Sequence, residues 1–300
     1  MMIFKTNTYR PAPMVMGLIL SFSMVMGPQM ANADQDDRLD HRKDYRMESI
    51  SGGAFRNYVS THVTEDDLWA RSMRTFGSFH NHMHELMSHM AKYGVEVRGD
   101  REHVPEFTHR ISGGEWARYR ESLEEAGDDS DWYELVRITE IMHDRVHHAM
   151  ARSLVYDRDS RNRDVDLGDF LRGEALEHGA GIPDAGERRI SEVSLDAFRE
   201  WAWRYETEPP HLHESVQGMV VFAHLLDDLL TQWLAHGDSM APENCRPQPG
   251  LLARRGEGWS DYLAQIEDCE DAEWREFVKV AGLMRDRIHH MMHKMKAYQK

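Results

Sequence analysis

The apolar residues of this chain recur at helical spacing over four long stretches. In each stretch, large apolar residues fall at positions i, i+3, i+4 and i+7, which is typical of a helix with one face in a core. The stripe of the first stretch consists of Trp69, Phe76, Phe79, Met83, Leu86, Met87 and Met90. The four stretches are 66–93, 131–156, 211–236 and 273–298. Four such helices joined in sequence predict an antiparallel four-helix bundle with a shared core.

A shorter motif precedes each long stretch. The segment 50–58 (ISGGAFRNY) matches 111–119 (ISGGEWARY), and 193–201 and 256–262 are a third and a fainter fourth copy. Each copy has a small-residue start, an aromatic residue, and a second aromatic residue three positions later, so both rings share one face of a short helix. A serine before the small residues of the motif is a typical helix N-cap. We therefore expect a short helix before each long one.

The long stretches are related in pairs. WYELVRI at 132–138 aligns with WREFVKV at 274–280, and one constant offset pairs Phe55 with Phe198 and Gly94 with Gly237. We interpret the chain as a duplicated helical hairpin in an all-α fold. The predicted segments are a first hairpin at 34–156, a polar linker at 157–189 and a second hairpin at 190–300, with both halves in one bundle. Polar connectors are also expected at 95–109 and at the proline-containing segment 240–258.

The first 33 residues predict a secretory signal. Lys5 and Arg10 provide a positive start, 14–27 is an uncharged apolar run, and Ala31-Asn32-Ala33 is an A-x-A cleavage signal. The apolar run is shorter than the roughly 20 residues of a membrane-spanning helix. We expect cleavage near Ala33 and a periplasmic or secreted mature protein without stable membrane insertion.

Charge and cysteine content narrow the function classes. The formal net charge is −16, and loss of the two basic signal residues makes it −18. Such a chain is a poor nucleic-acid binder, because phosphate contacts need clustered Lys and Arg. In an oxidising compartment Cys245 and Cys269 could form one disulfide around a local loop. Their spacing argues against a thioredoxin-like redox motif and against covalent haem.

Histidines occupy equivalent positions in the long stretches. Fifteen residues after the first large apolar residue of each stretch stand His84, His147, Asp227 and His289. Four residues before these stand His80, His143, Ala223 and Arg285. An i, i+4 pair lies on one helical face, so two imidazoles can reach one ion. If the first two helices are antiparallel neighbours, two pairs converge as four imidazoles, and Asp227 and His289 complete that site or form a weaker one.

The residues around these positions favour a transition metal. Neutral imidazole suits zinc, copper, iron and nickel. Neighbouring methionines favour copper, because thioether is a soft ligand for Cu(I); they are Met83, Met87, Met142, Met150, Met284 and Met292. The adjacent Asn81, Asp144 and Asp286 are expected to orient ring N–H groups. The other histidines, His82, His89, His148, His290 and His293, are expected at the surface.

These features predict an exported metal-binding bundle for copper storage, delivery or sensing, with zinc or iron as possible metals. A di-metal centre or a non-covalent haem, in a redox or electron-transfer protein, is one alternative. Glu85, Asp228, Asp144 and Asp286 supply its carboxylates, although Glu85 falls far from the core stripe on a helical wheel. A structural or partner-binding scaffold is another. The H-[ND]-x-x-H pairs are similar to histidine pairs of coupled binuclear copper proteins such as tyrosinases, over these short segments alone.

Overall fold

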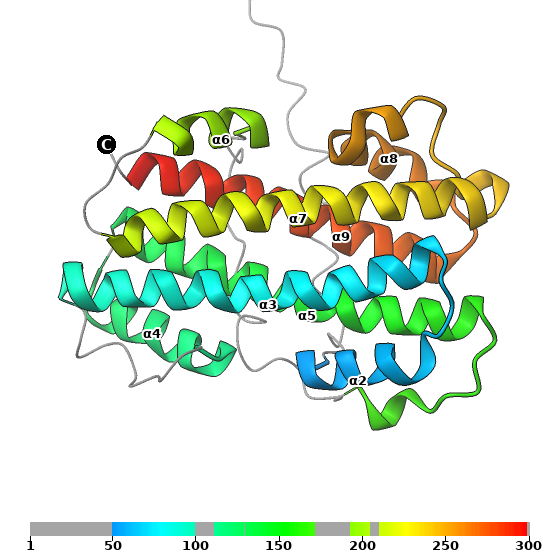
Figure 1. The fold of residues 1–300 in the computed structure, drawn as a ribbon, viewed down its shortest axis with the longest axis horizontal. Helices are drawn as coiled ribbons and strands as arrows, with labels where there is room; N and C mark the ends of the chain where they lie inside the picture. Colours follow the sequence, from blue (N-terminus) through cyan, green and yellow to red (C-terminus); the bar gives the residue numbers. More distant parts are fainter. Residues whose placement is uncertain (1–49, 100–110, 129, 172–192, 205–209, 299–300) are drawn as a thin grey trace, which may run out of the picture. The chain divides into compact units, whose positions relative to one another are not determined.

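The computed structural model describes residues 50–99, 111–128, 130–171, 193–204 and 210–298. All of them belong to one unit of the chain, Asp44–Lys300. Within these ranges every regular element is a helix, as the sequence predicted (Figure 1). The expected signal segment 1–33 and most of the expected linker 157–189 lie outside the described residues.

Each predicted long stretch forms one helix. The long helices are α3 (Leu68–Tyr93), α5 (Asp131–Ser160), α7 (Pro210–Met240) and α9 (Ala272–Tyr298). The apolar stripes that predicted them are buried, and the large side chains of the stripe in α3 are at most 1% exposed. Burial of this apolar surface is the main favourable contribution to the packing of such helices.

The long helices pack as a helical bundle. The most extensive contacts join α3 to α7 and α5 to α9, with smaller contacts between α3 and α5 and between α7 and α9. Trp69 of α3 contacts Tyr156 of α5, and Tyr93 at the other end of α3 contacts Trp132, so α3 and α5 are antiparallel. The closest partners therefore come from different halves of the chain rather than from one predicted hairpin.

Short helices cover the two outer sides of the bundle. They are α2 (Gly52–His62), α4 (Gly113–Glu125), α6 (Leu195–Arg204) and α8 (Trp259–Gln265). In Figure 1, α2 and α4 lie beside α3 and α5, whereas α6 and α8 lie beside α7 and α9. Ser51 and Ser112 are the predicted N-caps, and their hydroxyls accept hydrogen bonds from the amides of Ala54 and Glu115.

Hydrogen bonds between aromatic side chains attach short helices to long ones. Trp132 Nε1 donates to the Tyr119 hydroxyl at 2.8 Å, and Trp274 Nε1 donates to the Tyr262 hydroxyl at 2.7 Å. All four side chains are fully buried. A buried indole N–H needs an acceptor, and the phenol oxygen provides it here.

In the first copy a carboxylate stands between the two aromatic residues. Buried Asp157 accepts hydrogen bonds from the Tyr58 hydroxyl at 2.8 Å and from Trp69 Nε1 at 3.0 Å. Arg163 Nε also donates to it at 2.7 Å. We expected a connector from residue 157 onward, but α5 continues to Ser160. The prediction was wrong because composition cannot show that a polar side chain has buried partners.

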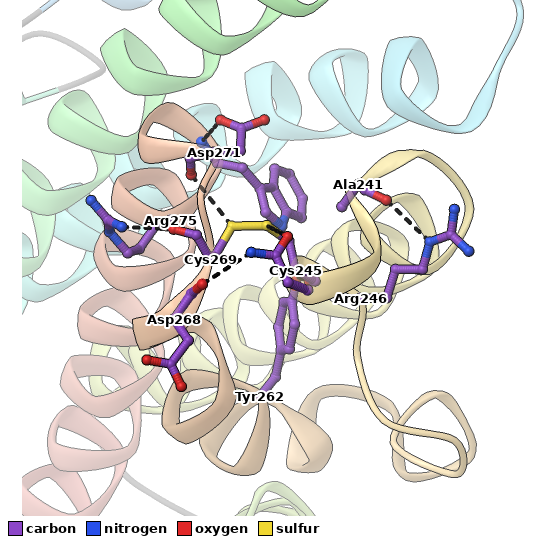
Figure 2. Close-up of a disulfide and its surroundings, with 10 residues drawn as sticks. Ala241, Cys245, Arg246, Tyr262, Asp268, Cys269, Asp271 and Arg275 are labelled. Carbon is purple, nitrogen blue, oxygen red and sulfur yellow. Dashed lines mark hydrogen bonds between the residues drawn. A yellow bond between two sulfur atoms is a disulfide. The ribbon is translucent and has the colours of Figure 1, made fainter.

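A disulfide ties the segment after α7 to the start of α9 (Figure 2). It joins Cys245 to Cys269, which are 24 residues apart and each 1% exposed. The Tyr262 hydroxyl donates to the carbonyl oxygen of Cys245 at 2.6 Å. The tyrosine that attaches α8 to α9 therefore also contacts a residue of the disulfide. The bridge that the sequence allowed is therefore present.

None of the helices within the described ranges is both long and apolar enough to cross a bilayer.

Candidate metal centre

Four histidines of α3 and α5 meet between the two helices. The Nε2 atom of His80 lies 3.2 Å from that of His84 and 3.3 Å from that of His147. The Nε2 atom of His147 lies 3.1 Å from that of His143. The rings of His84 and His143 have centroids 5.1 Å apart. Two pairs at i, i+4 spacing thus present their Nε2 atoms to one small space, because α3 and α5 are antiparallel neighbours.

The spacing of these nitrogens suits metal coordination. Tetrahedral ligands at a metal–nitrogen distance of about 2.0–2.1 Å lie about 3.3–3.4 Å from one another. The three Nε2 separations of 3.1–3.3 Å are close to this value. Ligand atoms of His80, His84 and His147 all lie within 4.8 Å of one another, so this buried cluster could bind a metal. His143 lies beside this group, with its Nε2 atom 3.1 Å from that of His147.

Backbone carbonyls fix the orientation of two of the rings. His84 Nδ1 lies 2.8 Å from the carbonyl oxygen of Ile111, and His147 Nδ1 lies 2.6 Å from that of Ile50. A carbonyl oxygen only accepts, so each Nδ1 carries the proton and donates it. In a neutral ring this leaves the lone pair on Nε2. Such an outer hydrogen bond is the usual means of setting the tautomer of a metal-binding histidine.

Two glycines allow the other two rings, those of His80 and His143, to pack against the first residues of α2 and α4. A Cβ at Gly52 would lie 2.2 Å from His80 Cε1, and a Cβ at Gly113 would lie 2.4 Å from His143 Cε1. Real Cβ atoms do not approach so closely, and the rings are held between packed helices. Glycine at the first residue of α2 and of α4 is therefore required by the positions of His80 and His143.

Burial keeps the imidazoles of His80 and His147 neutral. Burial is the main cause that lowers the pKa of His80 far below its usual range, and the neighbouring His147 lowers it further. Burial, followed by the neighbouring His143, lowers the pKa of His147 to about 3. Histidine must be neutral to bind a metal, so these low pKa values keep the His80 and His147 rings in the form that can act as ligands near neutral pH.

Asp227 and His289 lie in the other half of the bundle. His289 Nδ1 donates to the carbonyl oxygen of Val193 at 2.8 Å, which is the same type of bond that His84 and His147 make. Among the described residues, the group of side chains within ligand distance of one another contains neither Asp227 nor His289. Ala223 and Arg285 occupy the two remaining equivalent positions.

The orienting partners differ from those expected. For His84 and His147 they are backbone carbonyls. The Asn81 side-chain oxygen accepts a hydrogen bond from Arg56 Nη1 at 3.0 Å. Asp144 Oδ1 lies 3.5 Å from His143 Nδ1, a distance at which its charge still acts on the ring. The sequence suggested side chains for this role because adjacent residues are visible in it, whereas a contact with the backbone of a distant segment is not.

The remaining histidines divide between surface and core. His82 lies 2.9 Å from Glu85, and His89 lies 3.0 Å from Glu214, with all four side chains at least one-third exposed. The expectation of surface positions was wrong for His148 and His290, which are each 5% exposed. Each follows a repeat histidine, His147 or His289, directly in the sequence.

Two carboxylates of the di-metal alternative, those of Glu85 and Asp228, are exposed. The side chain of Glu85 is 57% exposed and interacts with His82, and Asp228 is exposed on α7. A carboxylate-bridged centre needs such groups directed into the bundle interior. The position of Glu85 on the helical wheel had already placed it away from the core.

Sequence reasoning missed Ile50, Ile111, Gly52 and Gly113. All four lie in the repeated ISGG tetrapeptide, which we interpreted as a helix start alone. The same tetrapeptide occurs once for each H-x-x-x-H pair, and this coincidence was the available signal. No protein family model matches the chain, and no curated protein or solved structure matches it.

Proposed function

We propose that this protein binds a transition-metal ion through His80, His84, His143 and His147. One observation carries the proposal: the Nε2 atoms form a series from His84 through His80 and His147 to His143, and neighbouring atoms in this series lie 3.1–3.3 Å apart. Two of the rings are already held in the ligand tautomer by Ile50 and Ile111. A site organised before the ion arrives loses little conformational entropy on binding.

Copper is the metal that we favour. Imidazole suits copper and zinc alike, and the ligands here are neutral. An ion with a single charge, such as Cu(I), costs less to bury among neutral ligands than a divalent ion. Four methionines of the same two helices, Met83, Met87, Met142 and Met150, are fully buried and supply a soft, polarizable environment. Zinc and iron are the other metals that the ligand set accepts.

The ligand set favours storage, delivery or sensing over catalysis. Four protein ligands complete a tetrahedral shell, whereas catalytic metal sites keep a position open for water or substrate. An exported location, periplasmic or secreted after cleavage near Ala33, agrees with the disulfide, because such bonds persist in oxidising compartments.

We also propose that the bundle is a four-helix bundle derived from a duplicated hairpin, with the metal site in the first half. Equivalent contacts support this. The Trp–Tyr hydrogen bond of α5 with α4 recurs in α9 with α8. The histidine-to-carbonyl bond recurs at His84, His147 and His289.

The test is metal analysis of the protein purified from its native export compartment. We expect one copper ion per chain, and loss of that ion in a His84→Ala/His147→Ala double variant. The matched control is His82→Ala/His89→Ala. It removes two partly exposed histidines of α3 and should leave the metal content unchanged. Absence of stoichiometric metal from the wild-type protein, or equal binding by both variants, would overturn the proposal.

A further inference from the structure

Each of the two short helices at the site contacts one ligand from α3 and one from α5. The start of α2 contacts His80 through Gly52 and accepts a hydrogen bond from His147 at Ile50. The start of α4 does the same for the other two ligands, with His143 against Gly113 and His84 bonded to Ile111. The connection is crosswise, because His84 of α3 is bonded to α4 and His147 of α5 is bonded to α2.

From the end of the first turn onward, both short helices have side-chain anchors that do not involve the ligands. In α2 these are the buried ring of Phe55, packed on Phe76, and the hydroxyl of Tyr58 bonded to Asp157. In α4, Trp116 Nε1 donates to the carbonyl oxygen of Val136 at 3.0 Å. Only the first turns of α2 and α4 rest on the histidines, so only these turns can respond to the state of the site.

Without an ion, the four rings are joined only by hydrogen bonds between their Nε2 atoms. His84 and His147 carry their protons on Nδ1, so their Nε2 atoms are acceptors. His80 Nε2 is within 3.3 Å of both and has one proton at most, so it donates to only one of them. Rotation of the His84 or His147 ring out of the cluster breaks its hydrogen bond to Ile111 or Ile50. A metal ion satisfies all the lone pairs in the observed ring orientations and strengthens the Nδ1–H donors.

We propose that occupancy of this site controls the docking of the first turns of α2 and α4, an inference that rests on the proposed function. With the ion bound, both turns close over the ligands. With the ion absent, the turns separate from the rings while the later anchors hold. The undocked state opens a route for the ion between the short helices, and the docked state reports that the ion is present. Storage, delivery and sensing all require such a difference between the two states.

The second half of the bundle provides an internal control. Helix α6 begins in the same way as α2, with Ser194 as its cap and His289 bonded to Val193. The residue equivalent to His80 is Ala223, so this helix start has one histidine contact without a cluster. The same amide bond reports on each helix: Phe55 to Ser51 at 2.9 Å, Trp116 to Ser112 at 3.0 Å and Phe198 to Ser194 at 2.9 Å.

The experiment is residue-resolved amide hydrogen exchange on the mature chain with and without one equivalent of Cu(I) from a buffering chelator, with Zn(II) as a second probe. Metal binding is first measured by competition with the chelator. We expect exchange at Phe55 and Trp116 to slow at least tenfold on metal binding, with Phe198 unchanged within a factor of two.

The outcomes separate the two proposals. Failure to bind either metal would overturn the proposed function, and this inference with it. Binding with unchanged exchange at Phe55 and Trp116, or with equal slowing at Phe198, would overturn this inference alone, because the site would then be filled without control of these two turns.

Discussion

The Nε2 atoms of His80 and His147 lie 3.3 Å apart, across two helices and 67 residues of sequence. Each ring also lies beside the other histidine of its own helix, His84 or His143, but contacts within one helix cannot bring the two helices together. The approach of the two rings results from the antiparallel packing of α3 and α5 together with the short helices α2 and α4, which press on the rings from outside. Metal binding should therefore stabilise four helices at once, and several measurable consequences can be expected.

Metal binding should raise thermal stability. An ion at about 100 times its dissociation constant stabilises the folded state by about 2.7 kcal/mol. For a protein of this size, that corresponds to a rise in melting temperature of about 5–10 °C. Calorimetry with and without Cu(I) should show this rise in the wild-type protein and no rise in His80→Ala or His147→Ala. A rise that persists in both variants would place the ion elsewhere.

Two neighbouring glycines should respond to alanine in opposite directions. Gly52→Ala forces the ring of His80 to move, because the new Cβ would lie 2.2 Å from Cε1. It should cost about 1–3 kcal/mol of unfolding free energy and weaken metal binding at least tenfold. Gly53→Ala meets only Ser51 Oγ, at 3.9 Å, and should be neutral or stabilise the protein by up to about 1 kcal/mol. Chemical denaturation and metal competition measure both, and similar effects of the two substitutions would contradict the placement of His80.

The second half should accept a metal once the missing ligands are supplied. His289 is already bonded to Val193, whereas buried Arg285 brings a positive charge to the position equivalent to His143. Ala223→His/Asp227→His/Arg285→His restores the four imidazoles, and Leu195→Gly restores the space that Gly52 provides in the first half. We expect two ions per chain in the quadruple variant.

The matched control for this design lacks the Leu195→Gly change. It should remain at one ion per chain, because the Cβ of residue 195 would meet the new ring at position 223. Two ions in the control would show that the glycine is dispensable, and one ion in both variants would show that the halves are not equivalent.

The unfolding free energy should decrease as the pH is lowered from about 6.5 to about 4, in part because of His236. Burial, followed by the charge of Arg161, lowers the pKa of this histidine to about 4, and its Nε2 lies 3.1 Å from the Tyr156 hydroxyl. The unfolded chain, with a histidine pKa of about 6.5, binds the proton more readily in this window. Protonation therefore favours unfolding, by up to about 1.4 kcal/mol per pH unit for this group.

Urea denaturation of metal-free protein at several pH values measures the effect. His236→Gln should have a slope of stability against pH that is smaller by about one proton, whereas the half-exposed His82→Gln should keep the wild-type slope. An unchanged slope in His236→Gln would show that this group does not contribute.

The disulfide should contribute measurably to stability. It closes a loop of 24 residues, for which chain-entropy arguments give about 3 kcal/mol. Cys245→Ser/Cys269→Ser should lose about this amount in denaturation experiments and should not respond to reductant, unlike the wild-type protein. Metal binding at the histidines should be unchanged, since the bridge lies between the segments that flank α8. A loss of metal binding in this variant would mean that the two regions are coupled.

The sequence predicted much of the secondary structure, because each long helix has a strongly periodic apolar face and three of the short helices, α2, α4 and α6, begin at a capping serine. It also identified the four histidines that converge, since spacing within one helix fixes which side chains share a face. It failed at Asp157, predicted in a connector, and at His148 and His290, predicted at the surface. In each case the side chain has surroundings supplied by distant segments.

By itself, the sequence determined that helices form, where most of them begin and end, and which histidines lie at the edge of each apolar stripe, since these properties depend on residues within a few turns. Only the tertiary structure decided that α3 packs most extensively on α7 and α5 on α9, that His84 is bonded to Ile111 and His147 to Ile50, and that Gly52 and Gly113 make room for the rings. These relationships join segments tens of residues apart, and the packing of side chains in the assembled core selects them.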